Sequence, residues 1–158
     1  MNISTLITPA RIACHQDINS KIAALKKISQ ILAKDLEQPE YENKIFDSLY
    51  QREKISSTAV GNSAAIPHGS LGNYDNIIGV LIILTHPIDF ESFDNTGVDI
   101  LFAVLAPEKY KNKHVKILSN LAKLFNNQQI CNEIRQEKES QGVLELICQW
   151  EKSTQTAS

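Results

Sequence analysis

Two long apolar runs constrain the fold of this chain more than any other feature. Residues 77–84 read Ile-Ile-Gly-Val-Leu-Ile-Ile-Leu, and residues 98–105 read Val-Asp-Ile-Leu-Phe-Ala-Val-Leu. β-Branched and aromatic side chains fill both runs without a helical period, which is typical of strands buried on both faces. We therefore expect two interior strands of one sheet. Pro107 is expected to end the second strand, and a short strand over 85–90 is expected between them.

Helical periodicity marks the segments on either side of these runs. Apolar residues recur every three or four positions, which predicts amphipathic helices over 21–36, 39–54 and 111–125. Asn19 or Ser20 is available as the N-cap of the first helix. The chain thus supplies helices both before and after its predicted strands.

The carboxyl-terminal part alternates a helical pattern with a polar break. Residues 128–135 and 140–150 are predicted to be helical, and 153–158 are expected to form a frayed tail. With no internal repeat or linker, residues 1–158 are expected to form a single domain. Interspersed strands and helices predict the α/β class, as one mixed β-sheet flanked by helices on both faces in a three-layer α/β/α arrangement.

Composition excludes several classes of function. The 158 residues carry a formal net charge of −2, so no general attraction to nucleic acid is expected. The three cysteines, Cys14, Cys131 and Cys148, are odd in number and widely spaced, which indicates neither a disulfide framework nor a zinc site. A reducing cytoplasm is the expected location.

Neither export nor membrane insertion is expected from the sequence. The amino terminus lacks a basic stretch followed by a continuous apolar segment. The longest apolar run, 77–84, is far shorter than the roughly 20 residues that a membrane-spanning helix needs. Any connection with a membrane is therefore expected to go through a partner.

The segment 57–69, Ser-Thr-Ala-Val-Gly-Asn-Ser-Ala-Ala-Ile-Pro-His-Gly, carries the candidate chemistry. His68 stands between a proline and a glycine, and hydroxyls and a small residue upstream, at Ser57, Thr58 and Gly61, are expected to bind an anion such as phosphate. A neutral imidazole attacks near pH 7, and its second nitrogen can be hydrogen-bonded to fix the tautomer. His68 is therefore a candidate nucleophile for phosphoryl transfer.

Taken one at a time, the candidate residues have simpler interpretations. A lone His68 is more often a hydrogen-bonded loop histidine than a nucleophile. His114 can simply satisfy the start of a helix, and Arg52 can be a solvated cation at a helix end. Their combination, not any one residue, favours a phosphate site.

A family resemblance runs through most of the chain. It is carried by Arg52-Glu53, Ser57-Thr58, Gly61-Asn62, Ala65-Ile-Pro-His-Gly69, Pro87-Ile-Asp-Phe90, 93–107 and 113–122. In these stretches the chain resembles the IIA domains of the fructose/mannitol class of the bacterial phosphoenolpyruvate-dependent phosphotransferase system (PTS). The sequence around Asp94-Asn95 and 98–102 looks most like the nitrogen-regulatory branch of this family.

The resemblance implies a phosphotransferase that works as a carrier. His68 matches the histidine that is phosphorylated on Nε2, His114 the second active-site histidine, and Arg52 the active-site arginine. A histidine phosphocarrier protein is implied as the donor, and regulatory proteins as targets. Neither a metal nor an organic cofactor is implied.

Two other functions stay open. A sugar-specific IIA component would pass the phosphate to a IIB domain of a membrane transporter. A non-catalytic binding module with the same fold would have lost transfer. The latter is allowed by Ala59 and Ser63, where the family usually has glycine, and by Ala64, where it has an aliphatic residue.

Overall fold

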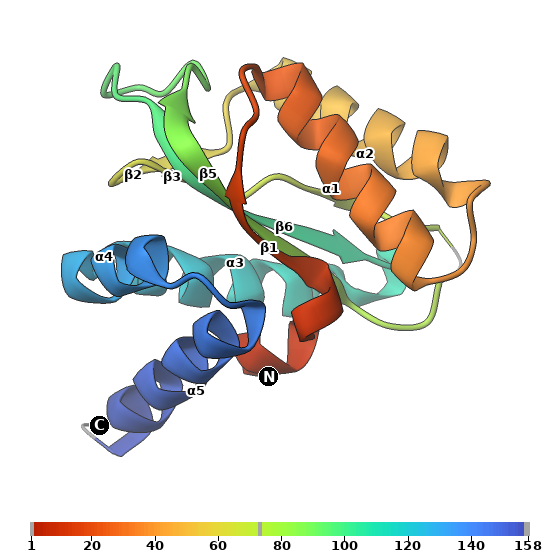
Figure 1. Cartoon of the computed structure of the whole chain (residues 1–158). Coiled ribbons are helices and arrows are strands. Elements are labelled where there is room, and N and C mark those ends of the chain that lie inside the picture. Colours follow the sequence, from red (N-terminus) through yellow and green to blue (C-terminus); the bar gives the residue numbers. More distant parts are fainter. Residues whose placement is uncertain (1, 73, 157–158) are drawn as a thin grey trace.

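The computed structural model describes residues 2–72 and 74–156, and in them a six-stranded sheet lies between two layers of helices (Figure 1). One face is covered by α1 (Lys21–Asp35) and α2 (Tyr41–Ile55). The other face is covered by α3 (Lys111–Phe125), α4 (Gln128–Gln136) and α5 (Ser140–Thr156). The predicted three-layer α/β architecture is confirmed.

The sheet is built around two long antiparallel strands. The strands are β1 (Ile12–Gln16), β2 (Ala59–Gly61), β3 (Ala64–Ala65), β4 (His68–Ser70), β5 (Ile78–Ile88) and β6 (Val98–Ala106). Their order is β1-β5-β6-β3-β2, and β4 also pairs with β6. Both predicted interior strands are therefore confirmed. The separate short strand expected over 85–90 is wrong, because β5 continues without a break to residue 88, where it still pairs with β6.

Alternation along β6 explains why its sequence is apolar at nearly every position. Phe102 and Val104 belong to the core beneath α3, α4 and α5. Leu101 and Ala103 belong to the core beneath α1 and α2. Successive side chains of a strand point to opposite faces, so burial of both faces removes the polar half of the pattern.

The helices begin and end close to their predicted limits. The helix α3 has the predicted bounds, α1 ends one residue early, and α2 begins two residues late. The Ser20 hydroxyl caps α1 by accepting a hydrogen bond from the Ala23 N–H. The expected frayed tail is helical as far as residue 156, where the Thr154 hydroxyl donates to the Trp150 carbonyl. Residues 157 and 158 lie outside the described part.

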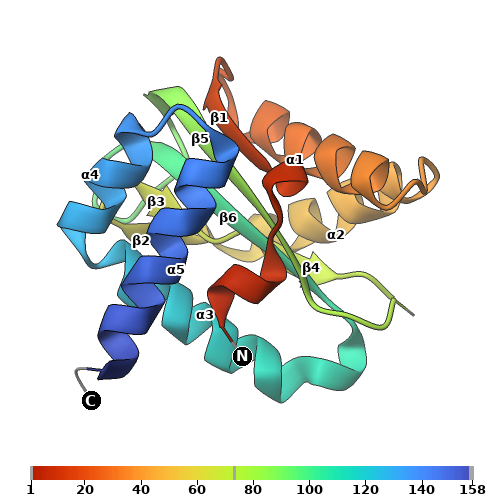
Figure 2. The same ribbon diagram turned by 60° about the horizontal axis from the view of Figure 1, so that its bottom comes forward.

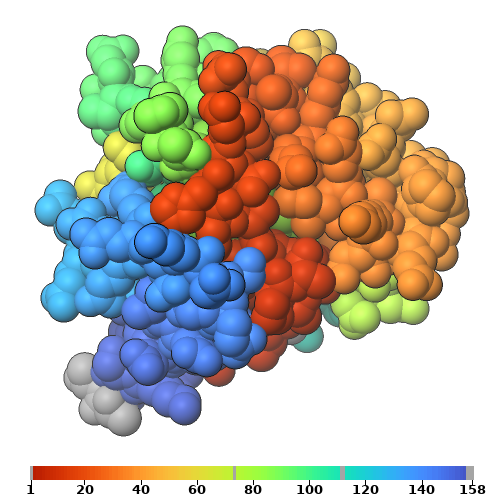
Figure 3. All heavy atoms as spheres, in the orientation of Figure 1, coloured from red at the N-terminus to blue at the C-terminus, as the bar shows by residue number. Residues whose placement is uncertain are grey.

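The amino-terminal segment joins the two helical layers. It forms the 3₁₀ helices η1 (Ile3–Leu6) and η2 (Pro9–Arg11), then β1, and it fills the surface between α1 and α5 (Figure 3). The buried carboxylate of Glu151 in α5 accepts hydrogen bonds from the Ile3 and Ser4 N–H groups, at 2.6 and 3.1 Å. Among the described residues no helix is both long and apolar enough to cross a membrane.

One edge of β6 determines where the candidate nucleophile lies. The strands β3 and β4 lie end to end along this edge, both parallel to β6, with β2 and β3 at one end and β4 at the other (Figure 2). Pro67 separates them because it has no N–H to donate, although its carbonyl accepts from the Val104 N–H at 2.9 Å. His68 begins β4 just after this interruption.

Candidate active site

Close packing of α2 on β4 brings Arg52 to the strand that carries His68. The Ser48 hydroxyl of α2 accepts a hydrogen bond from the Ser70 N–H at 2.7 Å. A Cβ at Gly69 would collide with the same serine, so only glycine allows this approach. Arg52 lies one helical turn beyond Ser48 on the same face of α2. The proline-histidine-glycine sequence thus fixes both the strand start and the helix contact.

His68 has its ring fixed in one tautomer. Its Nδ1 lies 2.8 Å from the Ile66 carbonyl oxygen. A carbonyl can only accept, so Nδ1 carries the proton and Nε2 keeps its lone pair. Burial lowers the pKa of His68, with the Arg52 charge acting in the same direction, while the Ile66 hydrogen bond and the Glu53 charge oppose them. The result is a neutral imidazole with a nucleophilic Nε2 near pH 7.

His114, in the first turn of α3, lies against His68. The two rings meet edge to face, with their centroids 5.2 Å apart and their planes at 90°. Burial, and then the neighbouring His68, lower the pKa of His114. Its Nε2 is buried and has no hydrogen-bond partner within the described residues. A desolvated ring nitrogen without a partner is costly at rest and is available to an incoming polar group.

Arg52 completes a group of three beside the strand end. Its Nη1 donates to the Ser56 carbonyl at 2.8 Å. A guanidinium has five N–H donors in a planar fork that matches phosphate oxygens, so this bond leaves donors for a ligand. The Ser48 contact places this part of α2 against the strand that begins with His68, and the ring contact adds His114 to the group.

The hydroxyls of Ser57 and Thr58 are occupied by protein acceptors. The Ser57 hydroxyl donates to the Phe90 carbonyl at 2.6 Å, and the Thr58 hydroxyl donates to Glu53 Oε2 at 2.7 Å. From the sequence, both hydroxyls were expected to bind phosphate. In this structure they order the loop after α2 instead.

Gly61 lies far from His68, contrary to its expected place in a phosphate cradle. Gly61 pairs with Ala64, which lies opposite Ile100 of β6, whereas His68 lies opposite Val104. The β6 partners Ile100 and Val104 are four residues apart, which corresponds to about 13 Å along the strand. The φ of Gly61 is +91°, a value that shapes the β2–β3 turn. Two of the family departures, at positions 63 and 64, lie at this far end too.

Sequence reasoning missed two contributors to the site. Glu53 is buried and binds Thr58, although only its place in the Arg52-Glu53 pair distinguishes it in the sequence. The contact between Ser48 and Gly69 joins residues 21 positions apart, and no local pattern signals it. Ser48 and Glu53 both belong to α2, the helix that also carries Arg52.

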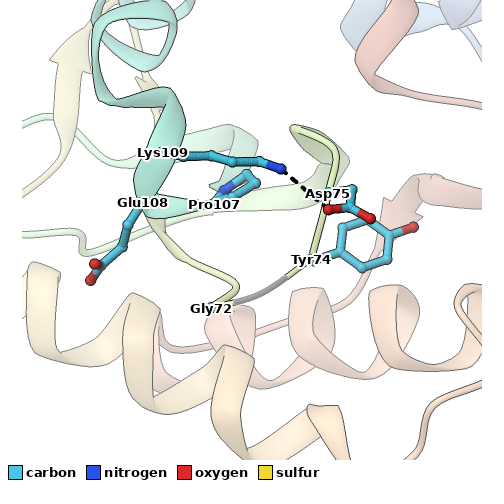
Figure 4. Close-up of a pocket in the computed structure, with 6 residues that line it drawn as sticks. All are labelled: Gly72, Tyr74, Asp75, Pro107, Glu108 and Lys109. Carbon is cyan, nitrogen blue, oxygen red and sulfur yellow. Dashed lines mark hydrogen bonds and ion pairs between the residues drawn. The ribbon is translucent and has the colours of Figure 1, made fainter.

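A cavity lies beside the site without including it. It has a volume of about 370 Å³ and lies between the loop after β4 and η3 (Glu108–Tyr110), where Lys109 bridges to Asp75 at 3.2 Å (Figure 4). Its lining residues are Gly72, Tyr74, Asp75, Pro107, Glu108 and Lys109. Neither histidine nor Arg52 is among them. The histidine pair is therefore not part of this pocket for a small molecule.

Comparison with known proteins gives consistent matches. The sequence profile described as phosphoenolpyruvate-dependent sugar phosphotransferase system, EIIA 2, matches residues 5–150. A nitrogen regulatory protein of Bradyrhizobium diazoefficiens is 37% identical over 147 residues, which cover 93% of this chain and 95% of the relative. The crystal structure of nitrogen regulatory protein IIA-Ntr from Neisseria meningitidis superposes with a TM-score of 0.85 at 25% identity, covering 92% of this chain and 98% of that one.

A more distant structural match shares the fold. It is the mannitol IIA enzyme of Escherichia coli in complex with phosphorylated IIB, with a TM-score of 0.73 at 18% identity. The match covers 90% of this chain and 96% of the mannitol protein. At this identity the likeness concerns the fold alone.

Proposed function

The chain belongs to the EIIA 2 family of the PTS, and from this membership we propose that it carries a phosphoryl group on Nε2 of His68. One observation supports the atom as well as the residue. The Ile66 carbonyl holds the proton on Nδ1, so the free lone pair of the neutral ring is on Nε2. A histidine that is neutral, half-buried and fixed in one tautomer is suited to this role.

The proposed step is a direct transfer between two histidines. The Nε2 lone pair of His68 forms a bond to phosphorus as the bond to the donor's ring nitrogen breaks, and that electron pair returns to the donor. No proton needs to move, because Nδ1 of His68 keeps its own. Arg52 supplies N–H donors to the equatorial oxygens of the phosphoryl group, and these donors stabilise the negative charge on the oxygens in the transition state.

His114 contributes at the same place. The incoming negative charge raises the proton affinity of a histidine 5.2 Å away, so His114 can become a cation and hydrogen-bond donor once the phosphoryl group arrives. Its unpartnered Nε2 then gains the partner that it lacks at rest.

The donor is proposed to be a phosphorylated histidine phosphocarrier protein, and the setting the cytoplasm. The output is proposed to be regulatory, because a phosphorylated histidine adds negative charge to the surface and changes which proteins bind. The relatives named nitrogen regulatory protein support this branch, at 37% identity over nearly the whole chain. A sugar-specific role with a IIB partner is the second candidate, supported by the family profile, whose description names a sugar phosphotransferase system.

A labelling experiment tests the carrier function. Incubation with phosphoenolpyruvate and the upstream phosphotransferase proteins is expected to add one phosphoryl group, stable in base and labile in acid. His68→Ala is expected to abolish the label while the chain stays folded. Unchanged labelling of this variant would refute the assignment. Transfer onward to an isolated IIB domain would favour the sugar-uptake candidate.

A further inference from the structure

Glu53 is a buried charge beside the site that the transfer step does not use. Only 6% of its surface is exposed. Its Oε1 accepts from the Thr58 N–H at 2.8 Å and its Oε2 from the Thr58 hydroxyl at 2.7 Å. Two hydrogen bonds to one loop residue fix that residue in position and orientation.

Lys21 from the start of α1 pairs with the same carboxylate. Its Nζ lies 3.0 Å from Glu53 Oε1, and only 14% of the lysine side chain is exposed. The ammonium also lies 3.4 Å from the Phe90 carbonyl and 4.7 Å from the centre of the Phe90 ring. Glu53 and Lys21 therefore tie together α1, α2, the loop after α2 and the segment before β6.

The loop held by Glu53 is the one that holds Arg52. The guanidinium donates to the Ser56 carbonyl, and Ser56 is two residues before Thr58. Fixing Thr58 therefore limits where the Ser56 carbonyl can lie, and the carbonyl limits the guanidinium. The chain of contacts runs from a buried ion pair to the cation beside His68.

We propose that Glu53 and Lys21 are positioning residues for phosphoryl transfer, acting through Thr58 and the Ser56 carbonyl on the guanidinium of Arg52. The inference rests on the proposed carrier function. Neither residue needs to touch the phosphoryl group. Misplacing a charged group by about 1 Å can cost as much as 100-fold in rate, so loss of the ion pair is expected to act on the transfer step.

A purely structural role for the pair makes a different prediction. A buried ion pair adds little net stability, whereas removing one partner destabilises the fold because the other charge is left buried. Loss of stability alone would lower the folded fraction without changing the rate constant of the folded protein. The test must therefore measure the transfer step in folded protein.

The main variant is Glu53→Gln, with Asp47→Asn on the exposed face of α2 as the matched control. Single-turnover transfer from the phosphorylated carrier protein is measured over a range of donor concentrations. We expect Glu53→Gln to lower the maximal rate about tenfold, with the half-saturating donor concentration changed less than about twofold. Asp47→Asn is expected to change neither quantity. In an Arg52→Ala background, Glu53→Gln is expected to have no further effect on the rate.

Thr58→Val supplies a second variant that keeps Glu53 and Lys21 paired. It removes only the hydroxyl bond, and we expect a loss of about threefold in rate that also disappears in the Arg52→Ala background. If a thermal melt shows no unfolding transition for Glu53→Gln, the Thr58→Val variant is used for the test instead.

An unchanged rate in the folded variants would overturn the inference, as would a rate loss that persists without Arg52. Absence of any label on the unsubstituted chain would instead overturn the carrier function, and the inference with it.

Discussion

An arginine lies near each end of the edge formed by β3 and β4, and the two guanidiniums differ in how many protein acceptors they bind. At the β2–β3 end, Arg135 donates from Nε to both Asp99 oxygens at 3.0 Å, from Nη1 to Asn132 and from Nη2 to the Asn62 carbonyl. At the β4 end, Arg52 makes one hydrogen bond with the described residues, to the Ser56 carbonyl. Arg135 joins three residues of the fold, whereas most N–H donors of Arg52 are left for a ligand.

The histidine pair continues the same contrast. His68 keeps a free lone pair on Nε2, and His114 keeps a buried Nε2 without a partner in the described residues. Near Arg135, by comparison, the Asn62 side-chain amide donates a hydrogen bond to the Phe125 carbonyl at 3.0 Å. Buried polar groups are normally paired, so the end where pairing is incomplete is the one that fits an outside group. The difference separates a structural cluster from a site.

The largest effect expected from this comparison is on transfer at the β4 end. Arg52→Ala should lower the rate of His68 phosphorylation about 100-fold, because it removes the cation that meets the developing charge. Stability to urea should change by less than about 0.5 kcal/mol, since the side chain makes one exposed hydrogen bond. A variant that is clearly destabilised but still transfers at full rate when folded would reverse the roles assigned to the two ends.

At the β2–β3 end the opposite result is expected. Arg135→Met should lower the free energy of unfolding by about 2 kcal/mol, because Asp99 and the Asn62 carbonyl lose their partner while largely buried. The transfer rate should stay within about twofold of the unsubstituted chain. Chemical denaturation and single-turnover labelling of the same sample measure both quantities, and a marked loss of transfer in this variant would break the comparison.

A smaller effect on transfer is expected from the second histidine. His114→Ala should slow phosphorylation about tenfold, because the ring that can donate to the phosphoryl group is removed. The thermal melt should shift little, since no described residue forms a hydrogen bond with the ring nitrogen that is lost. Stopped-flow labelling gives the rate, and an unaltered rate would remove His114 from the site.

The smallest expected effect is a pH dependence of stability. Burial lowers the pKa of both His68 and His114, so the unfolded chain binds more protons than the folded chain as the pH falls. This contribution is complete above the unfolded value of about 6.5 and is lost as the pH falls through the folded values. Urea titrations at pH 7.5 and 5.5 should show a larger loss for the unsubstituted chain than for the His68→Gln/His114→Gln double variant. Equal losses would mean that the rings are not desolvated.

The sequence predicted the elements whose signal is local. Periodicity located α1 and α3 to within a residue, and the two apolar runs located the centre of β5 and β6. The strand β1 was missed, because its Ala-Cys-His-Gln stretch carries no strong strand pattern and it is recruited to the sheet by pairing with β5.

The site was predicted only in part, for a related reason. The resemblance selected His68, His114 and Arg52; the two histidine rings are in contact, and the helix that carries Arg52 packs on the strand of His68. Gly61 was assigned to the same site because it is near His68 in the sequence. The chain between them runs along β6, however, and an extended chain advances about 3.3 Å per residue, so the two residues lie far apart. The ion pair between Glu53 and Lys21 depends on packing between α1 and α2, which no short motif records.

The central claim, that Nε2 of His68 carries the phosphoryl group, is tested most directly by nitrogen NMR of the histidine rings in the phosphorylated chain. The account predicts a phosphorus coupling to Nε2 of His68, with the proton retained on Nδ1 against the Ile66 carbonyl. A coupling to Nδ1 of His68, or to any nitrogen of His114, would contradict it.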